Sequence, residues 1–229
     1  MKAEAPRRAV VFDFDGVIVT GSNEAYFPVY HAALEAVGHQ MPPEEERSLI
    51  LQYWSWPSSY FFRHLFGETD ERAETATRVY REALFSPTFM SALKVSDELR
   101  AALRRLADSD FGLGIVSGAN PRLIAGTLSH HRLDGLFPHI LSGYEFAPEQ
   151  QKPSPHMLFV AAERLGCPPG RCIYVGDADT DLGAARAAGM AFCAVLTGNL
   201  TRAEATRLGA DWIVDTAAEV ESVARQHLA

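Results

Sequence analysis

Short apolar runs alternate with helical patterns along most of the chain. A first run at residues 9–12 is followed, from about residue 95 onward, by further runs, and the segments between these carry apolar side chains every three or four positions. Strands that alternate with helices of this length form β-α-β units, so the pattern predicts an α/β fold with a Rossmann-like, mostly parallel sheet and helices on both faces. The later runs lie at 113–116, 140–141, 173–175, 192–196 and 212–214.

Polar residues mark where several of these predicted helices begin. Ser96 stands before an acidic first turn and an apolar repeat, as N-cap residues do. Thr201 with Glu204, and Thr216 with Glu219, fit the capping box, in which each side chain accepts a hydrogen bond from the backbone amide of the other residue. The segments between the strands are therefore predicted to be helices with defined ends.

The pattern changes between residues 21 and 92, where strand-like runs vanish and helical patterns dominate. We therefore expect an α/β core domain of residues 1–20 and 93–229, and an all-helical cap domain of residues 21–92 inserted after the first strand. The clearest helix of the insertion spans 69–85 and has one apolar face, made of Ala73, Ala76, Val79, Tyr80, Ala83 and Leu84.

Charge and cysteine content exclude several classes of protein. The net charge is −8 and the sequence contains only three lysines, without the basic stripe of a nucleic-acid binder. No apolar run reaches the roughly 18 residues that a membrane helix needs, so we expect neither nucleic acid nor membrane as a partner. The N-terminus lacks the apolar centre of a secretory signal, and the three cysteines show no metal-site spacing. These features predict a cytoplasmic protein with reduced thiols.

Side chains that can take part in catalysis or ligand binding follow four of the predicted strands. In an open parallel sheet, ligands bind outside the carboxyl ends of the strands, so residues that follow different strands are brought to one edge. Carboxylates, a hydroxyl and a lysine meet there in this sequence, and we take this convergence as the main evidence for an active site. The residues are Asp13 and Asp15, Ser117 with Gly118, Lys152, and Asp177 with Asp181 close behind.

Each residue type suits phosphoryl chemistry. Asp13 and Asp15 point the same way on an extended chain, and such close carboxylates repel one another unless a cation intervenes. Mg²⁺ prefers oxygen ligands and also screens an incoming phosphate. One carboxylate can then attack phosphorus while the other carries protons. Ser117 with the Gly118 amide can hold the phosphoryl oxygens, and Lys152 can neutralise their charge.

Four segments resemble the haloacid dehalogenase superfamily, in the phosphatase branch whose helical cap follows the first strand (the phosphoglycolate phosphatase and β-phosphoglucomutase type). The segments are VVFDFDGV at 10–17, IVSG at 115–118, QKPSP at 151–155 and YVGDADTD at 174–181. The resemblance implies an α/β core with an inserted cap and a Mg²⁺-dependent phosphatase that hydrolyses a small phosphorylated metabolite through an aspartyl-phosphate.

The resemblance also implies a role for each site residue. Asp13 is the nucleophile, and Asp15 protonates the leaving alcohol and then activates water. The Asp13 carboxylate, the Asp15 backbone carbonyl and Asp177 bind Mg²⁺. Lys152 with Ser117 and Gly118 binds the transferred phosphate. Asp181 orients both Lys152 and the metal site.

An aromatic stretch of the insertion has two interpretations. Phe61, Phe62 and Leu65 are expected to pack in the core of the cap. Trp54, Trp56 and Arg63 lie where relatives of this type place the loop that selects substrates, so a role in specificity is implied for at least one of them.

Several other functions compete with phosphate hydrolysis. Haloacid dehalogenation does not need a second acid, so the presence of Asp15 argues against it. Phosphonate cleavage needs a lysine in the cap, and no lysine lies between Gly16 and Leu93. A sugar phosphomutase shares the first half-reaction and stays open as the alternative. From a different class, a phospho-accepting receiver domain of signalling proteins also has clustered acids and a lysine, but it is shorter and lacks a helical insertion.

Overall fold

The structure, a computed structural model, describes residues 8–53 and 58–228. The chain forms two compact units. The α/β unit comprises the chain up to Thr20 and from Lys94 onward, and the helical unit is Gly21–Leu93. Thr20 and Lys94 exchange backbone hydrogen bonds of 2.9 and 3.0 Å, so the two connections leave the α/β unit side by side. That the helical unit works as a cap stays a prediction.

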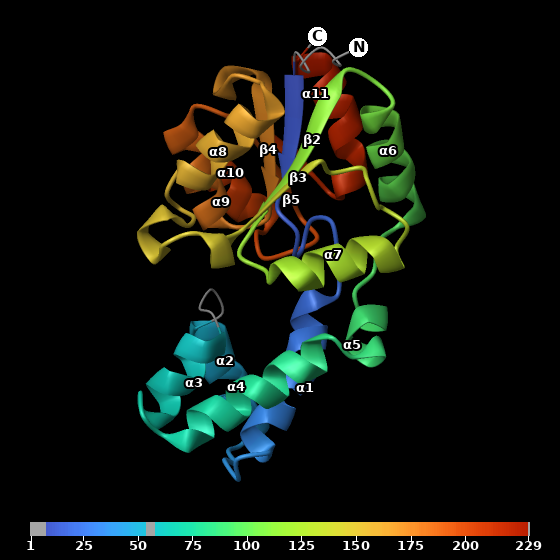
Figure 1. Cartoon of the computed structure of the whole chain (residues 1–229). Coiled ribbons are helices and arrows are strands. Elements are labelled where there is room, and N and C mark those ends of the chain that lie inside the picture. Colours follow the sequence, from blue (N-terminus) through green and yellow to red (C-terminus); the bar gives the residue numbers. More distant parts are fainter. Residues whose placement is uncertain (1–7, 54–57, 229) are drawn as a thin grey trace. The chain divides into compact units, whose positions relative to one another are not determined.

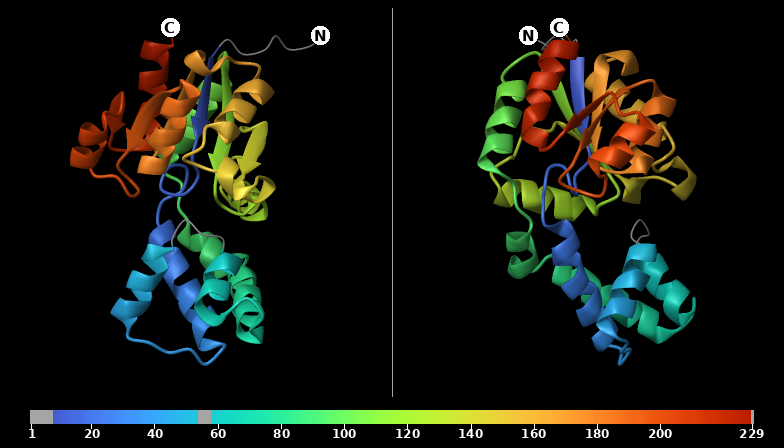
Figure 2. Two further views of the ribbon diagram at one scale, coloured as in Figure 1. Left: turned by 90° about the vertical axis from the view of Figure 1, so that its left-hand side faces the viewer. Right: turned by 180° about the vertical axis from the view of Figure 1, so that it is seen from behind.

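A six-stranded parallel sheet forms the centre of the α/β unit in the described residues (Figures 1 and 2). Its spatial order is β3-β2-β1-β4-β5-β6, and all neighbouring strands are parallel, as predicted. The first strand is thus central, and the chain builds outward from it in both directions. The strands are β1 (Arg8–Phe12), β2 (Phe111–Ser117), β3 (His139–Ser142), β4 (Cys172–Gly176), β5 (Ala191–Val195) and β6 (Trp212–Val214).

Helices cover both faces of this sheet, which leaves its central strands without contact with water. On one face α6 packs against α11, and on the other α8 packs against α9 (Figure 1). Every residue of β2 and β4 is buried, as expected for parallel strands covered on both sides. The helices of this unit are α6 (Asp97–Ala107), α7 (Pro121–His130), α8 (His156–Leu165), α9 (Asp179–Ala188), α10 (Arg202–Leu208) and α11 (Val220–His227).

The predicted helix caps are present, the last of them in part. The Ser96 hydroxyl accepts a hydrogen bond from Leu99 N–H, and Thr201 with Glu204 forms the capping box of α10. At Thr216 only half of the predicted box forms: its N–H donates to Glu219 Oε1 at 2.9 Å, its hydroxyl caps no amide, and the element that starts there is a short 3₁₀ turn (Ala217–Glu219) that leads into α11. A capping box satisfies the first free amides of either kind of helix, so the pattern locates a helix start without fixing the helix type.

Five helices make up the described part of the helical unit, and an aromatic cluster holds them together. The Tyr30 ring lies 5.1 Å from that of Phe61 and 4.6 Å from that of Tyr80, and Phe61 and Phe62 are buried. Such clusters supply much of the apolar area that a small helical unit can bury. The helices are α1 (Ser22–Glu35), α2 (Pro43–Gln52), α3 (Ser58–Phe66), α4 (Glu71–Leu84) and α5 (Pro87–Ala92). Among the described residues, no helix combines the length and apolar character needed to span a membrane.

Two neighbouring residues of α8 give a matched test of this packing. Leu158 is fully buried against the sheet, whereas Phe159 is 45% exposed. Leu158→Ala is expected to lower the free energy of unfolding by about 2–5 kcal/mol, because the truncation leaves a cavity. Phe159→Ala is expected to change it by about 0.5 kcal/mol or less. Urea denaturation of both variants checks this, and equal losses would mean that α8 does not pack as described.

Candidate active site

The turn after β1 carries the first two predicted acids. The Asp13 N–H donates to Val175 O at 2.8 Å, which prolongs the pairing of β1 with β4 and holds Asp13 at the sheet edge, where it is only 8% exposed. Asp15 is half-buried, and its backbone pairs with Val19. Gly16 has φ 74°, a conformation that favours glycine, and a Cβ there would lie 2.6 Å from Asp177 Oδ2. The turn therefore packs closely against the other end of the acidic cluster.

Lys152 joins two of the acids. Its Nζ lies 3.2 Å from Asp13 Oδ1 and 2.6 Å from Asp181 Oδ1, and its side chain is 13% exposed. Asp181 is fully buried, and its Oδ2 accepts hydrogen bonds from the backbone N–H groups of Asp177 and Ala178, both at 3.1 Å. Asp181 therefore has donors on both carboxylate oxygens and is held rigidly in place.

Asp177 is held by a loop that the sequence analysis did not single out. Its Oδ2 accepts hydrogen bonds from both the backbone N–H and the side-chain Nδ2 of Asn199, each at 2.8 Å. A Cβ on Gly198 would lie 1.9 Å from the same oxygen, so only glycine permits this approach. Thr197 Oγ1 donates to Gly16 O at 2.6 Å. This loop follows β5, so extending the strand-end rule to residues 197–199 would have found it.

Three carboxylates of this edge can share a cation. Asp13, Asp177 and Asp181 each offer an oxygen, and these atoms lie within 4.8 Å of one another. Because Asp181 already accepts hydrogen bonds on both oxygens, Asp13 and Asp177 are better suited to bind the ion directly. An all-oxygen donor set of this kind fits a hard cation. Asp15 is predicted to bind the metal through its backbone carbonyl, so this group of carboxylates does not test Asp15 as a ligand.

Burial makes it costly for the carboxyl groups of this cluster to be ionised. It raises the pKa of Asp13 to about 6, against the opposing charge of Lys152. Burial, together with the charges of Asp13 and Asp181, raises the pKa of Asp177 to about 8. Burial would lower the pKa of Lys152, but Asp13 and Asp181 outweigh it and raise that pKa well above its ordinary value. The lysine therefore stays charged, and the two carboxylates with raised pKa values favour either a proton or a cation beside them.

Ser117 ends β2, and Gly118 follows it in the turn before α7. Ser117 is 2% exposed, and its Oγ accepts a hydrogen bond from Ala119 N–H at 3.1 Å. A Cβ on Gly118 would meet no atom within 4 Å, so there is open space at this turn. Both residues thus lie at the carboxyl end of the strand beside β1, and their contact with phosphoryl oxygens stays a prediction.

A buried tyrosine also belongs to the polar network. Tyr174 in β4 has its hydroxyl 3.1 Å from Lys152 Nζ and 3.2 Å from Asp181 Oδ1. Burial and the charge of Asp181 raise its pKa well above the ordinary value, so the hydroxyl keeps its proton. In the sequence, Tyr174 belongs to an apolar run and begins the segment YVGDADTD, and neither pattern predicts a role for its hydroxyl.

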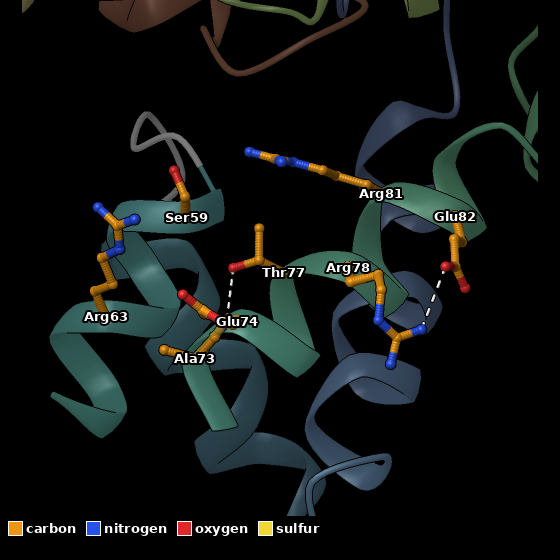
Figure 3. A pocket seen from close by; sticks show the side chains of 8 residues that line it. All are labelled: Ser59, Arg63, Ala73, Glu74, Thr77, Arg78, Arg81 and Glu82. Atoms are coloured by element: carbon orange, nitrogen blue, oxygen red, sulfur yellow. Dashed lines mark hydrogen bonds and ion pairs between the residues drawn. The ribbon is translucent and has the colours of Figure 1, made fainter. Parts of the chain in front are cut away.

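Arg63 is exposed on α3, whereas Trp54 and Trp56 lie outside the described residues. Arg63 and Ser59 from α3, with Thr77 and Arg81 from α4, line a pocket of about 370 Å³ within the helical unit (Figure 3). Arg78, on the same pocket wall, pairs with Glu82 at 3.3 Å. Within residues 8–53 and 58–228, no carboxylate lies within ion-pair distance of Arg63 or Arg81. The full lining holds three arginines and two glutamates, Glu74 and Glu82, so its net charge is +1.

The chain is similar to one protein family and to several known proteins. The model of the family described as haloacid dehalogenase-like hydrolase matches residues 10–195, a range that contains every predicted site residue. A phosphoglycolate phosphatase of Synechococcus elongatus is 26% identical over 213 residues, 93% of this chain and 95% of that protein. One of Xanthomonas campestris is 28% identical over 191 residues, 83% and 84% of the two chains. A HAD-superfamily hydrolase of subfamily IA, variant 1, from Geobacter sulfurreducens shares the fold, with TM-score 0.69, 21% identity and coverage of 97% of this chain and 99% of its own.

Added Mg²⁺ is expected to raise the unfolding temperature more at about pH 8 than at about pH 5.5. Without metal, the folded protein binds protons at Asp13 and Asp177 that the unfolded chain releases, so these groups make the protein less stable as the pH rises from about 4 to about 8. A cation competes with those protons and therefore stabilises the fold more as they dissociate. Thermal unfolding with and without Mg²⁺ at both pH values measures the difference.

Asp177→Asn is the decisive variant for this prediction. It is expected to be more stable than the wild type near pH 8 without metal, and to lose most of the shift caused by Mg²⁺. Asp134→Asn, at an exposed position, is the control and is expected to keep the shift. A shift of equal size at both pH values, or one that survives in Asp177→Asn, would show that the cluster does not bind the ion.

Proposed function

The chain belongs to the haloacid dehalogenase-like hydrolase family, and from this premise we propose that it is a Mg²⁺-dependent phosphatase that hydrolyses a small phosphate monoester through an aspartyl-phosphate on Asp13. The observation that carries the proposal is the pairing of a buried carboxylate with a buried ammonium at the sheet edge, Asp13 Oδ1 to Lys152 Nζ at 3.2 Å. Both the attacking oxygen and the charge that stabilises the transferred group are thereby placed before substrate arrives.

The reaction consists of two displacements at phosphorus. In the first, an Asp13 oxygen forms a bond to phosphorus, the bond from phosphorus to the alcohol oxygen breaks, and Asp15 gives that oxygen a proton. In the second, Asp15 takes a proton from water, the water oxygen bonds to phosphorus, and the bond to Asp13 breaks. Asp13 and Asp15 return to their starting states, and the products are the alcohol and inorganic phosphate.

The other residues stabilise charge on the phosphoryl group. Lys152 faces Asp13 and offsets the negative charge of the phosphoryl oxygens, and Ser117 with the Gly118 amide donates hydrogen bonds to them. The carboxylates of Asp13 and Asp177 and the carbonyl of Asp15 would hold Mg²⁺, which would supply positive charge for an anionic substrate that approaches these acids. Asp181 fixes Lys152 through the 2.6 Å contact.

The substrate that we propose to test first is phosphoglycolate. The relatives with this activity in their names are similar over most of this chain, which supports a small phosphoester that also carries a carboxylate. The net positive charge of the pocket that Arg63 and Arg81 line in the helical unit suits an anionic group. We therefore retain a role for Arg63 in substrate selection.

Asp13→Asn is expected to abolish phosphate release and the phosphoenzyme, with a loss of roughly 10⁶-fold, because an amide cannot replace a covalent carboxylate nucleophile. Release of phosphate from a panel of small phosphoesters, together with acid-quench trapping of labelled enzyme, measures both effects. EDTA is expected to stop the wild-type reaction and Mg²⁺ to restore it.

Asp179→Asn is the control for this experiment, because Asp179 is an exposed acid close to Asp177 and is expected to be dispensable. Wild-type-like turnover in Asp13→Asn would refute the mechanism. Conversion of β-glucose 1-phosphate to the 6-phosphate without release of phosphate would identify a mutase instead.

Asp15→Asn is expected to slow hydrolysis of an alkyl phosphate by roughly 10²–10⁴-fold, the usual contribution of general acid catalysis. Hydrolysis of p-nitrophenyl phosphate is expected to suffer less, because its leaving group needs little protonation. The two rates are compared in the same variant, and equal losses would remove Asp15 from the acid role.

Arg63→Ala is expected to raise KM for phosphoglycolate by about tenfold, the value of one charge-assisted hydrogen bond, and to change KM for p-nitrophenyl phosphate little. Arg78→Ala is the matched control, because Arg78 lines the same pocket but is paired with Glu82. Steady-state kinetics with both substrates test the prediction. An equal change in KM for the two substrates would show that Arg63 does not select for the carboxylate.

A further inference from the structure

The hydroxyl of Tyr174 is the one polar group on an otherwise apolar strand, and it lies in the middle of the acid–lysine network. Tyr174 is fully buried in β4, and its ring packs near that of Phe192, with centroids 6.4 Å apart. A phenylalanine would fill the same apolar space. A buried hydroxyl is costly unless it forms hydrogen bonds, so its presence calls for partners that need it.

Those partners come from three separate segments. Lys152 Nζ donates to the hydroxyl at 3.1 Å, and the hydroxyl donates to Val116 O at 3.0 Å; Asp181 Oδ1 lies at 3.2 Å. A phenol has a single proton, so it donates to Val116 O or to Asp181, and its lone pairs remain for the lysine. When it donates to Val116 O, the hydroxyl links Lys152 to β2, one residue before Ser117 at the end of that strand.

Two of the three protons of the Lys152 ammonium group go to Asp181 and Tyr174. The third remains for the side of Asp13, whose Oδ1 forms an ion pair with Nζ at 3.2 Å and accepts no hydrogen bond from the described residues. The three donors of a lysine ammonium rotate together about the bond to the stem. The contacts with Asp181 and Tyr174 therefore set the direction of the third N–H bond.

We propose that Tyr174 is a positioning residue for the reaction: together with Asp181, its hydroxyl orients the Lys152 ammonium so that one N–H points at Asp13 and at the phosphoryl group transferred to it. This inference rests on the proposed function. It differs from a packing role, because it assigns the effect to one oxygen atom that acts through Lys152.

Tyr174→Phe removes only that oxygen. We expect kcat to fall by about 10–100-fold while KM changes by less than about threefold, because Lys152 loses its orientation toward charge that is greatest in the transition state. The loss is expected to be similar for p-nitrophenyl phosphate and for an alkyl phosphate, unlike the loss in Asp15→Asn. Inhibition by vanadate, which resembles the transition state, is expected to weaken in parallel with kcat, and inhibition by inorganic phosphate to change little.

Phe192→Leu is the matched control, because it loosens the same part of the core without touching the hydroxyl. Rates are compared per folded enzyme, with Mg²⁺ present and at a temperature at which both variants are folded. A Tyr174→Phe enzyme within twofold of the wild type in both kcat and vanadate inhibition would overturn the proposal, as would an equal loss of kcat in Phe192→Leu. Absence of turnover in the wild type would instead refute the proposed function.

Discussion

The burial of three carboxylates around a single lysine is the constraint on which the rest of the site depends. If Asp13, Asp177 and Asp181 are all ionised, Lys152 offsets one of their charges and two remain in a region shielded from water. Such charges are tolerated only with hydrogen bonds and a counter-ion. The surrounding residues meet this need in part, with backbone amides that donate to Asp181 and both nitrogens of Asn199 that donate to Asp177.

The order of the strands explains how so many groups reach one place. Because β1 is central, Asp13 has β2 on one side and β4 on the other, so Ser117 and Asp177 arrive from its two neighbours. The chain reverses direction across the sheet at this point, which is where open α/β sheets bind ligands. Glycine is required where backbone passes the acids: a Cβ on Gly176 would lie 2.5 Å from the Cβ of Asp181. The fold thus accepts local crowding in order to assemble the site.

Sequence patterns predict most of this arrangement. The residues that they do not predict interact with partners that no local pattern reveals. Alternating strands and helices predict the parallel sheet, and the residues after each strand include Asp13, Lys152, Asp177 and Asp181, which the structure brings together. Tyr174 was not found, because an apolar run hides a hydroxyl whose partners lie 22 and 58 positions away. Asn199 was not found, because it belongs to no motif and acts only through Asp177.

The most direct test of the central claim is the stereochemical course at phosphorus. A phosphorothioate monoester made chiral at phosphorus with two oxygen isotopes is hydrolysed in water that carries the third isotope, and the configuration of the released thiophosphate is determined. Each in-line displacement inverts phosphorus, so the two displacements through Asp13 are expected to give net retention. Net inversion would show that water attacks the substrate directly, and it would contradict the assignment of Asp13 as nucleophile.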